Sequence, residues 1–328
     1  MTDRRVLTGI SSTAWEHPAD RAALQTLRAI PGFDEVVRRV MGFIGERGVR
    51  LLFTADAVKV GPNQRPKLYG LYQEVLQTLD WPDAPDLFVS QTPIANAMAV
   101  GFQRPFIVLN SGALTILDED ERRVLLGHEL GHVMSGHATY TTLALLIFNL
   151  GASGIPGLGL ITLPIQLALH EWYRKAEFSA DRAGLLATQD VNIAMRLFLK
   201  FAGGVPSDDE TSLDEFLVQA ADYETSGTVF DTAFKLLNTV GRTHPFNTVR
   251  AAELQRWVLS GDYEAILNDV YPRRGEDDLP LNRHYADAAA YYGAQTRETV
   301  RQVNDTLTDV LNKTRDAFGD LFRGRTND

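Results

Sequence analysis

The sequence predicts an α+β fold that is mainly α-helical and contains a small β-sheet. Most of the chain repeats apolar residues at spacings of three and four, which is the period of a helix with one buried face. Three short β-prone segments, "LFVSQ", "ANAMAVGF" and "FIVLNSG", follow one another between Leu87 and Gly112 and predict the sheet, and "QRP" between the second and third predicts a hairpin or small sheet there. With 328 residues, of which 45% are hydrophobic, the chain is long enough to bury one large core or two modest ones.

Residues 1–82 are expected to form a helical region that packs on the rest of the protein. Helical spacing predicts helices in "HPADRAALQTLRAI", in "FDEVVRRVMGFIGERG", which we expect to stop at its last glycine, and in "RPKLYGLYQEVLQTLD". The segment "VRLLFTADAVKVG", which begins at Val49, is instead expected to be a strand.

The central region, residues 83–270, carries the candidate site and includes a stretch at 138–169 that has no charged residue. The sequence "GASGIPGLG" interrupts this stretch and leaves apolar arms of roughly 10 to 12 residues, whereas a helix that crosses a bilayer needs about 20. Two interpretations stay open. The stretch is either a helical hairpin packed on the protein or an element that contacts a membrane surface.

After this region we expect a linker at 271–284 and an amphipathic C-terminal helix at 285–328. The apolar stripe of that helix could dock on the body of the protein, join two copies into an oligomer or touch a membrane. The sequence does not choose among the three.

Composition excludes several classes of function. The formal net charge of -10, with no cluster of Lys and Arg among aromatic residues, argues against nucleic acid as a partner. The absence of cysteine excludes a disulfide framework, a thiolate zinc site and a cysteine nucleophile. The N-terminus has no apolar run and cleavage site of the secretory type. We therefore expect a cytoplasmic protein, with membrane association through 138–169 as the alternative.

The segment "LDEDERRVLLGHELGHVMSGH" is predicted to be a helix, capped by Asp118 and Glu121. His128 and His132 are four residues apart, so their side chains project from one face and can bind a single metal ion. Glu129 lies on the flank of that face, where it can act as general base on a water molecule. The alternative, a surface helix with two solvated histidines, is disfavoured by the apolar residues around them.

A catalytic zinc has three protein ligands, and the third is predicted to be Glu177 in "KAEFSADRAG". Asp181, one helical turn further on, can accept a hydrogen bond from the outer nitrogen of a ligand histidine. Alternatively, these two carboxylates form a solvated acidic face. His170 and Glu171 are the other upstream candidates. On a continued helix His137 would point roughly 140° away from the ion, so we expect it at the helix end or beside a ligand.

Four segments together resemble the HtpX-like zinc metallopeptidases, a group that includes the CAAX prenyl proteases and mitochondrial and periplasmic quality-control peptidases. They occur in the family's order and cover over half of the chain: "IANAMAVGFQRPFIVLNSGAL", "LLGHELGHVMSGH", "EFSADRAG" and "THPFNTVR". Family members of the HtpX type also carry long transmembrane helices before the metal motif and between it and the ligand glutamate. This chain has only the interrupted uncharged stretch in the second place.

The resemblance implies a zincin-like, gluzincin-type peptidase fold with one Zn²⁺ per chain. It also implies that the segment around Asn96 and Ala97 forms an edge strand beside the cleft, to which an extended peptide substrate adds. His244 and Arg250 would lie near the site as donors that stabilise the oxyanion or hold the substrate. Alternatively, His244 caps a helix and Arg250 is a structural ion-pair partner.

These observations predict a zinc-dependent endopeptidase that cleaves unfolded or damaged polypeptides. The alternatives are a zinc-containing chaperone that holds peptides with little or no turnover, and a non-proteolytic metallohydrolase. Glu129 favours an enzyme, because a purely structural zinc site has no use for a general base.

Overall fold

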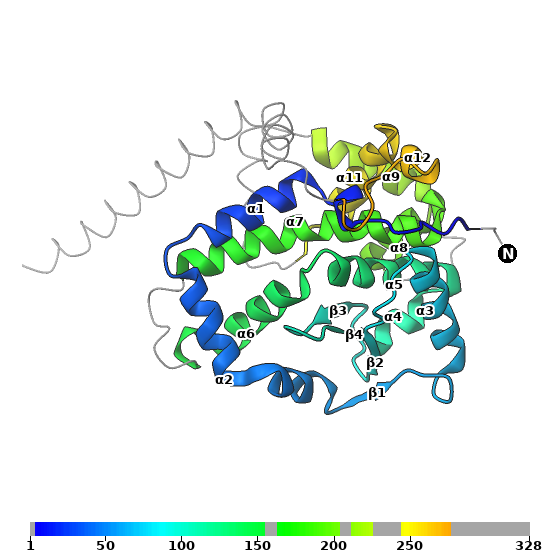
Figure 1. Ribbon diagram of the computed structural model, residues 1–328. Coiled ribbons are helices and arrows are strands. Elements are labelled where there is room, and N and C mark those ends of the chain that lie inside the picture. The colour runs from blue at the N-terminus through cyan, green and yellow to red at the C-terminus, as the bar shows by residue number, and fades with distance from the viewer. Residues whose placement is uncertain (1–3, 155–162, 204–210, 226–243, 277–328) are drawn as a thin grey trace, which may run out of the picture. The chain divides into compact units, whose positions relative to one another are not determined.

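Helices form most of the described protein and accompany a small sheet of four strands, as the sequence predicts. The computed structural model describes residues 4–154, 163–203, 211–225 and 244–276 (Figure 1). All of these belong to one compact unit, Met1–Thr225 with Gly241–Leu279. A second unit, Ser226–Val240 with Pro280–Asp328, lies outside the described residues, and so does the predicted C-terminal helix.

The N-terminal part is helical, with one short strand. Its elements are η1 (Ser12–Ala14), α1 (Pro18–Arg28), α2 (Phe33–Thr54), β1 (Ala57–Lys59) and α3 (Pro66–Thr78). The strand expected from Val49 is wrong in its first half, because α2 continues to Thr54. Leu51 and Leu52 are both exposed, so this apolar run does not alternate as a half-buried strand would. The helix is interrupted at Gly45, which has a φ of 66°, and not at the glycine three residues later.

The sheet combines parallel and antiparallel pairs. Strands β2 (Asp86–Ser90), β3 (Ala97–Val100) and β4 (Phe106–Asn110) join β1 in the order β1-β2-β4-β3. β2 and β4 are parallel, and the other two pairs are antiparallel. The predicted hairpin between the second and third β-prone segments is confirmed as β3–β4, and β3 lies at the edge of the sheet.

The central helices are α4 (Ser111–Ile116), α5 (Glu119–Met134), α6 (Ala138–Gly154) and α7 (Leu163–Thr188). The predicted capping box of α5 is present: Asp118 accepts from the backbone N–H of Glu121, whose carboxylate accepts from the backbone N–H of Asp118. In Figure 1, α7 runs through the middle of the unit with α1 along it. The sheet lies on the side of α5 that is opposite α7.

Helices α5 and α7 approach closely because small residues face each other. A Cβ atom on Gly127 would lie 2.3 Å from Cβ of Ala187, and one on Gly131 would lie 2.5 Å from Cβ of Ala183. Real Cβ atoms do not come that close, so any side chain at either glycine would push the helices apart. This close contact brings the histidine-bearing face of α5 next to the acidic residues of α7.

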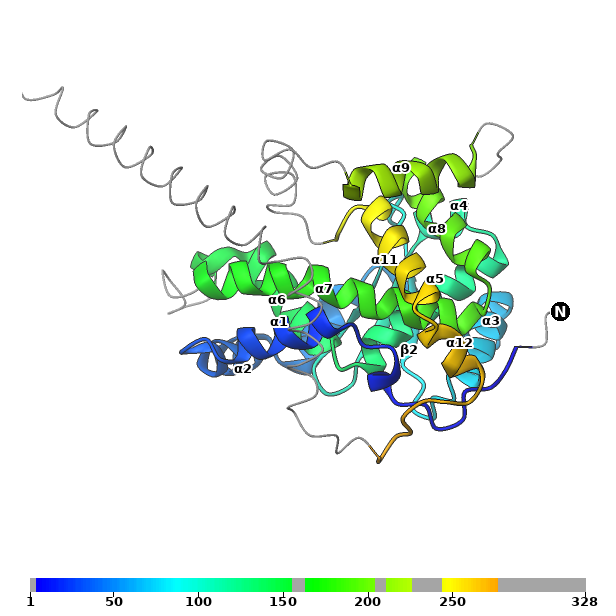
Figure 2. The same cartoon turned by 90° about the horizontal axis from the view of Figure 1, so that it is seen from above.

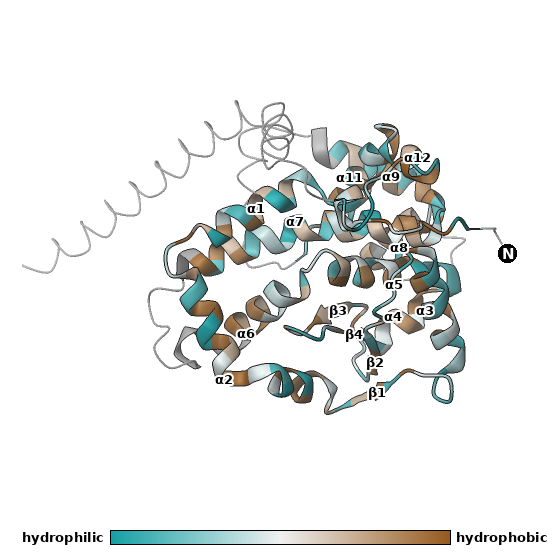
Figure 3. Ribbon diagram, in the orientation of Figure 1, coloured by the Kyte–Doolittle hydropathy of each residue, from teal (hydrophilic) through white to brown (hydrophobic). Residues whose placement is uncertain are grey.

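The described part of the uncharged stretch packs on the protein. Leu143 and Ile147 of α6 and Leu169 of α7 are buried in one core cluster with residues of α2, β2, β3 and β4. Figure 3 shows mostly hydrophobic residues along α6, β3 and β4. The predicted break at "GASGIPGLG" covers residues 151–159: residues 151–154 continue α6, and residues 155–159 lie outside the described residues. Among the helices of the described ranges, none has the length and hydropathy needed to cross a membrane.

Four helices complete the described unit: α8 (Val191–Gly203), α9 (Leu213–Thr225), α11 (Asn247–Leu259) and α12 (Asp262–Leu267). α11 packs against α7, α8 and α9, as Figure 2 shows, and so carries Arg250 to the central helices. Residues 271–276, at the start of the segment expected to be a linker, contact the N-terminal segment. Ile10 and Arg273 form a β-bridge, and the backbone N–H of Arg274 donates to the carbonyl of Gly9.

Candidate metal centre

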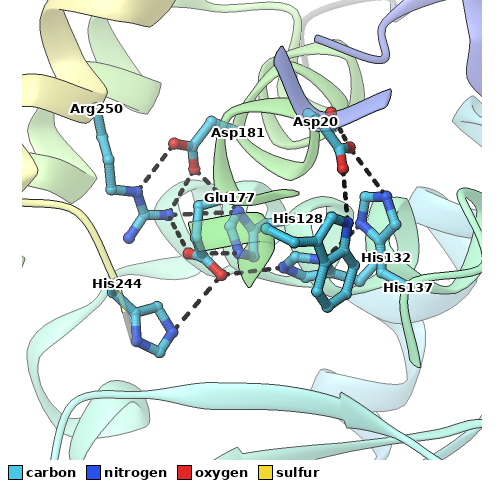
Figure 4. Close-up of polar contacts among 10 residues, drawn as sticks. Asp20, His128, His132, His137, Glu177, Asp181, His244 and Arg250 are labelled. Carbon is cyan, nitrogen blue, oxygen red and sulfur yellow. Dashed lines mark hydrogen bonds and ion pairs between the residues drawn. The ribbon is translucent and has the colours of Figure 1, made fainter. Parts of the chain in front are cut away.

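The structure brings together the three side chains that the sequence predicts as metal ligands (Figure 4). Oε2 of Glu177 lies 3.6 Å from Nε2 of His128, and Oε1 lies 3.3 Å from Nε2 of His132. One possible ligand atom from each residue lies within 4.8 Å of the other two, and all three residues are buried. The histidines come from successive turns of α5, while the carboxylate comes from α7.

This arrangement fits a divalent cation. Both carboxylate oxygens of Glu177 are buried, and neither accepts a hydrogen bond from the described residues. An unsatisfied buried carboxylate is costly unless a cation lies beside it. Burial alone would raise the pKa of Glu177, but His244, when protonated, and the guanidinium of Arg250 hold it well below its usual range. Glu177 is therefore ionised, as a metal ligand must be.

Asp181 contacts both a candidate ligand and Arg250. Its Oδ1 lies 3.0 Å from Nδ1 of His128, the ring nitrogen that faces away from Glu177. The guanidinium of Arg250 donates to both carboxylate oxygens of Asp181, at 2.9 and 2.5 Å, and lies 3.5 Å from Glu177. The resemblance implied that Arg250 acts on the substrate, but its strongest contacts here are with these two carboxylates.

Glu129 lies beside the cluster without being part of it. The residue is 3% exposed, and its Oε2 accepts no hydrogen bond from the described residues. Burial raises the pKa of Glu129 to about 7. A carboxylate with such a pKa can both take up and release a proton near neutral pH.

Residues of the four helices α5, α7, α8 and α11 line a narrow cavity at the cluster. Asn96 borders it just before β3, together with His128 and Glu129 of α5 and with His244. Nε2 of His244 lies 3.7 Å from Oε1 of Glu177, and its ring contacts that of Tyr173 edge-on. The cavity therefore joins the edge strand, the candidate general base and the candidate oxyanion donor.

The register of β3 determines where its backbone groups point. The backbone N–H of Asn110 donates to the carbonyl of Asn96, and Ala97 lies opposite Leu109. In an antiparallel ladder, hydrogen-bonded pairs alternate with pairs whose N–H and C=O groups point outwards. Ala97 belongs to an outward pair, so its N–H and C=O face the edge of the sheet away from β4.

His137 is not turned away from the cluster, because α5 does not continue as far as this residue. The helix ends at Met134, and Gly136 has a φ of 70°. The N–H of Gly136 donates to the carbonyl of Val133, and the N–H of His137 donates to the carbonyl of His132, which is a Schellman motif. This turn brings Nδ1 of His137 to 3.0 Å from Nδ1 of His132. His137 thus lies at the helix end and also beside a candidate ligand, which are the two places expected.

The structure also adds residues that the sequence did not point to. Nε2 of His137 lies 3.0 Å from Oδ2 of Asp20, a buried residue of α1. Nothing in the sequence links Asp20 to the site, although the glycine in "SGH" is a helix stop signal that could have predicted the turn.

His170 and Glu171 do not join the cluster. The ring of His170 stacks on Phe148, and Glu171 pairs with its helix neighbours Arg174 and Lys175.

Residues 62–258 match peptidase family M48 over a region that contains α5, α7 and Arg250, and hence every candidate ligand. The chain belongs to peptidase family M48. Its resemblance to the HtpX-like zinc metallopeptidases is thereby confirmed. This M48 protein is a metallopeptidase, a hydrolase whose substrates are polypeptides.

Several curated proteins are similar to this M48 peptidase. The plastoglobule-localized metallopeptidase 48 of Arabidopsis thaliana, described as chloroplastic, is 35% identical over 258 residues, which cover 77% of this chain and 74% of the relative. A protease HtpX homologue of Helicobacter acinonychis is 24% identical over 211 residues, or 56% of this chain and 68% of the relative. Another, of Moorella thermoacetica, is 30% identical over 114 residues, or 34% and 37% of the two chains. No solved structure shows significant similarity to the chain.

Proposed function

We propose that this M48 peptidase is a zinc-dependent endopeptidase with Glu129 as its general base. The observation that carries the proposal is the buried cluster of two imidazoles and one carboxylate, with Glu129 beside it. Two nitrogen ligands and one oxygen ligand are typical of a catalytic zinc, which keeps a further coordination position open. His128, His132 and Glu177 would hold the ion. When bound, it supplies a Lewis acid that polarises the scissile carbonyl and lowers the pKa of a water molecule towards about 7.

Glu129 carries the proton in this proposal. Its Oε2 faces no hydrogen-bond donor among the described residues and can accept a proton from the attacking water. The same carboxyl group then donates that proton to the amine nitrogen that leaves. Burial raises the pKa of this carboxyl group, which favours uptake of the proton from water.

Arg250 and His244 have different roles in this proposal. Arg250 contacts Asp181 and Glu177, so we assign it to holding these two carboxylates in place. His244 is partly exposed and lines the cavity, so it is the better candidate for a donor to the oxyanion.

The proposed substrates are unfolded or damaged proteins. Ala97 turns its N–H and C=O outwards at the sheet edge, and Asn96 next to it borders the cavity. An extended peptide can pair with such an edge through its main chain, which makes few demands on side chains. Folded proteins rarely offer a free extended segment of this kind, so the geometry favours unfolded chains.

Replacing Glu129 by Gln tests the proposal. Glu129→Gln should keep one zinc per chain while cleavage of an unfolded protein such as casein falls by at least about a thousandfold, since a glutamine cannot accept the proton. The control is Glu119→Gln, an exposed position at the start of the same helix, which should retain wild-type activity. Retained proteolysis in Glu129→Gln would refute the proposal. Wild-type protein that binds casein peptides and leaves them intact would support the chaperone instead.

A further inference from the structure

Outside the candidate ligands, a row of buried polar groups extends from His132 into the N-terminal helix α1. Nδ1 of His132 lies 3.0 Å from Nδ1 of His137, and Nε2 of His137 lies 3.0 Å from Oδ2 of Asp20. Asp20 and His137 are 1% and 2% exposed, so water does not compete for these contacts. Figure 4 shows the three side chains in sequence, with Asp20 at the end remote from Glu177.

The donors and acceptors in this row determine where the protons lie. An ionised carboxylate only accepts hydrogen bonds, so Nε2 of His137 must carry the proton that faces Asp20. When a metal ion occupies Nε2 of His132, the one proton of that imidazole lies on Nδ1, and the 3.0 Å contact then requires a bare accepting Nδ1 on His137. With its proton on Nδ1, His132 presents an unprotonated Nε2 towards Glu177. This is the tautomer that can bind a metal ion.

Asp20 is itself held by two further donors from α7. The indole Nε1 of Trp172 donates to Oδ1 at 3.0 Å, and Oγ of Ser179 donates to Oδ2 at 2.6 Å. Oγ of Ser179 in turn accepts from the backbone N–H of His17, which caps α1. The carboxylate is therefore fixed in position by groups that take no part in the row.

The other ligand histidine is supported directly by a carboxylate, since Asp181 lies 3.0 Å from Nδ1 of His128. For His132, the imidazole of His137 lies between the candidate ligand and the carboxylate of Asp20. We infer that Asp20 and His137 are positioning residues that hold His132 in its metal-binding tautomer and orientation. Asp20 lies outside residues 62–258, the region that matches the peptidase family. The N-terminal helix thus contributes to the metal site, and this inference rests on the zinc site proposed above.

Zinc affinity of the full chain tests the inference without any use of peptidase activity. Asp20→Asn removes the charge that orients His137 and should raise the zinc dissociation constant by about 10- to 100-fold, measured by competition with a chromophoric chelator. NMR spectra of zinc-loaded protein with ¹⁵N-labelled histidine should show a slowly exchanging, hydrogen-bonded Nδ1 proton on His132 in the wild type and faster solvent exchange of that proton in Asp20→Asn, although zinc on Nε2 keeps it on Nδ1 in both proteins.

Matched variants separate positioning from general damage to the fold. Ser179→Ala and Trp172→Phe each remove one hydrogen bond from Asp20 but leave its charge and its contact with His137. Both should stay within about threefold of the wild-type zinc affinity. If Asp20→Asn does not fold, His137→Asn and His137→Leu replace it. Asparagine can still accept from Nδ1 of His132, so it should bind zinc more tightly than leucine does.

Two results would overturn the inference. The first is a folded Asp20→Asn with wild-type zinc affinity and an unchanged histidine spectrum. The second is an equal loss of affinity in Ser179→Ala, which would indicate a structural role alone. Either result would leave the zinc site itself intact, whereas wild-type protein that binds no zinc would refute both the site and the positioning role.

Discussion

Oδ1 of Asp181 lies 3.0 Å from Nδ1 of His128, on the side of the ring that faces away from the candidate metal. The carboxylate therefore accepts the Nδ1 proton and leaves Nε2 free to bind. The same carboxylate is the main partner of the buried Arg250. Three side chains from different helices thus hold one another in place: the candidate ligand His128 of α5, Asp181 of α7 and Arg250 of α11.

This relationship predicts the effect of Asp181→Asn. The asparagine lacks the charge that Arg250 and His128 require, so zinc affinity should fall by about 10- to 100-fold, measured by chelator competition. Asp86→Asn is the matched control, because Asp86 pairs with Arg50 and Lys59 at a surface position on β2. Unchanged zinc binding in a folded Asp181→Asn would contradict the role assigned to this carboxylate.

The close contact of α5 and α7 predicts that Gly131→Ala damages the metal site. The new Cβ would meet Cβ of Ala183 at 2.5 Å, and overpacking of this kind costs about 1–3 kcal/mol. Because the helices must separate, zinc affinity should fall together with the free energy of unfolding measured in urea. Gly70→Ala, in open space on α3, is the control and should be neutral or stabilising.

A second substitution tests the cause of this damage. Ala183→Gly removes the atom that Gly131→Ala would strike, and the next neighbour, Cα of Ala180, lies at an ordinary 3.5 Å. The double variant should therefore regain most of the lost zinc affinity. A double variant that is as impaired as Gly131→Ala alone would show that steric conflict with Ala183 is not the reason.

The outward direction of Ala97 predicts a loss of substrate binding in Ala97→Pro. Proline removes the N–H that points away from β4 but no hydrogen bond of the β3–β4 ladder. The KM for a peptide substrate should rise at least about tenfold, while zinc content stays at the wild-type level. Ala97→Val adds similar bulk and retains the N–H. An equal rise of KM in the valine variant would assign the effect to bulk.

His17 predicts a loss of stability in mild acid. Burial lowers the pKa of this histidine to about 4, and its Nδ1 accepts the N-cap hydrogen bond from Ala19. The unfolded chain, with a pKa near 6.5, therefore binds the proton first as pH falls. The contribution of the neutral His17 to the free energy of unfolding is complete above about pH 6.5 and decreases as the pH falls towards 4. From pH 7.5 to 5 it removes about 2 kcal/mol from the free energy of unfolding.

The measurement is urea unfolding of wild type and His17→Asn at both pH values, with a chelator present so that metal release does not contribute. Asparagine is a good N-cap but does not titrate, so the free energy of unfolding of the variant should fall less than that of the wild type between the two pH values. Parallel pH dependence in the two proteins would show that His17 is not the titrating group.

Much of the site could be predicted from the sequence because it depends on helical geometry. The spacing of His128 and His132, the capping of α5 by Asp118, and the one-turn separation of Glu177 and Asp181 are local relationships that the helix repeat determines. The edge hairpin was predicted in the same way, from short β-prone segments around a turn. Each depends on residues that are near neighbours in the chain.

What failed were predictions that extended a local pattern too far. The first half of the strand expected from Val49 proved to be helix, and its exposed Leu51 and Leu52 do not show the alternating burial of a strand. The helix predicted to reach His137 in fact ends at Met134, before a glycine with positive φ, so the rotation calculated for a continued helix does not apply. The sequence contains that glycine, but the direction of the chain after the Schellman turn depends on the turn itself.

The sequence by itself determined the class of the protein and its candidate ligands, because metal-binding residues must recur at the period of the helix that carries them. Only the tertiary structure decided how the site is supported. Asp20 reaches His137 from α1, and Arg250 reaches Asp181 from α11, because separate helices pack on α7. No spacing in the chain records such contacts. They follow from the close approach that Gly127 and Gly131 permit and from the need of each buried charge for a partner.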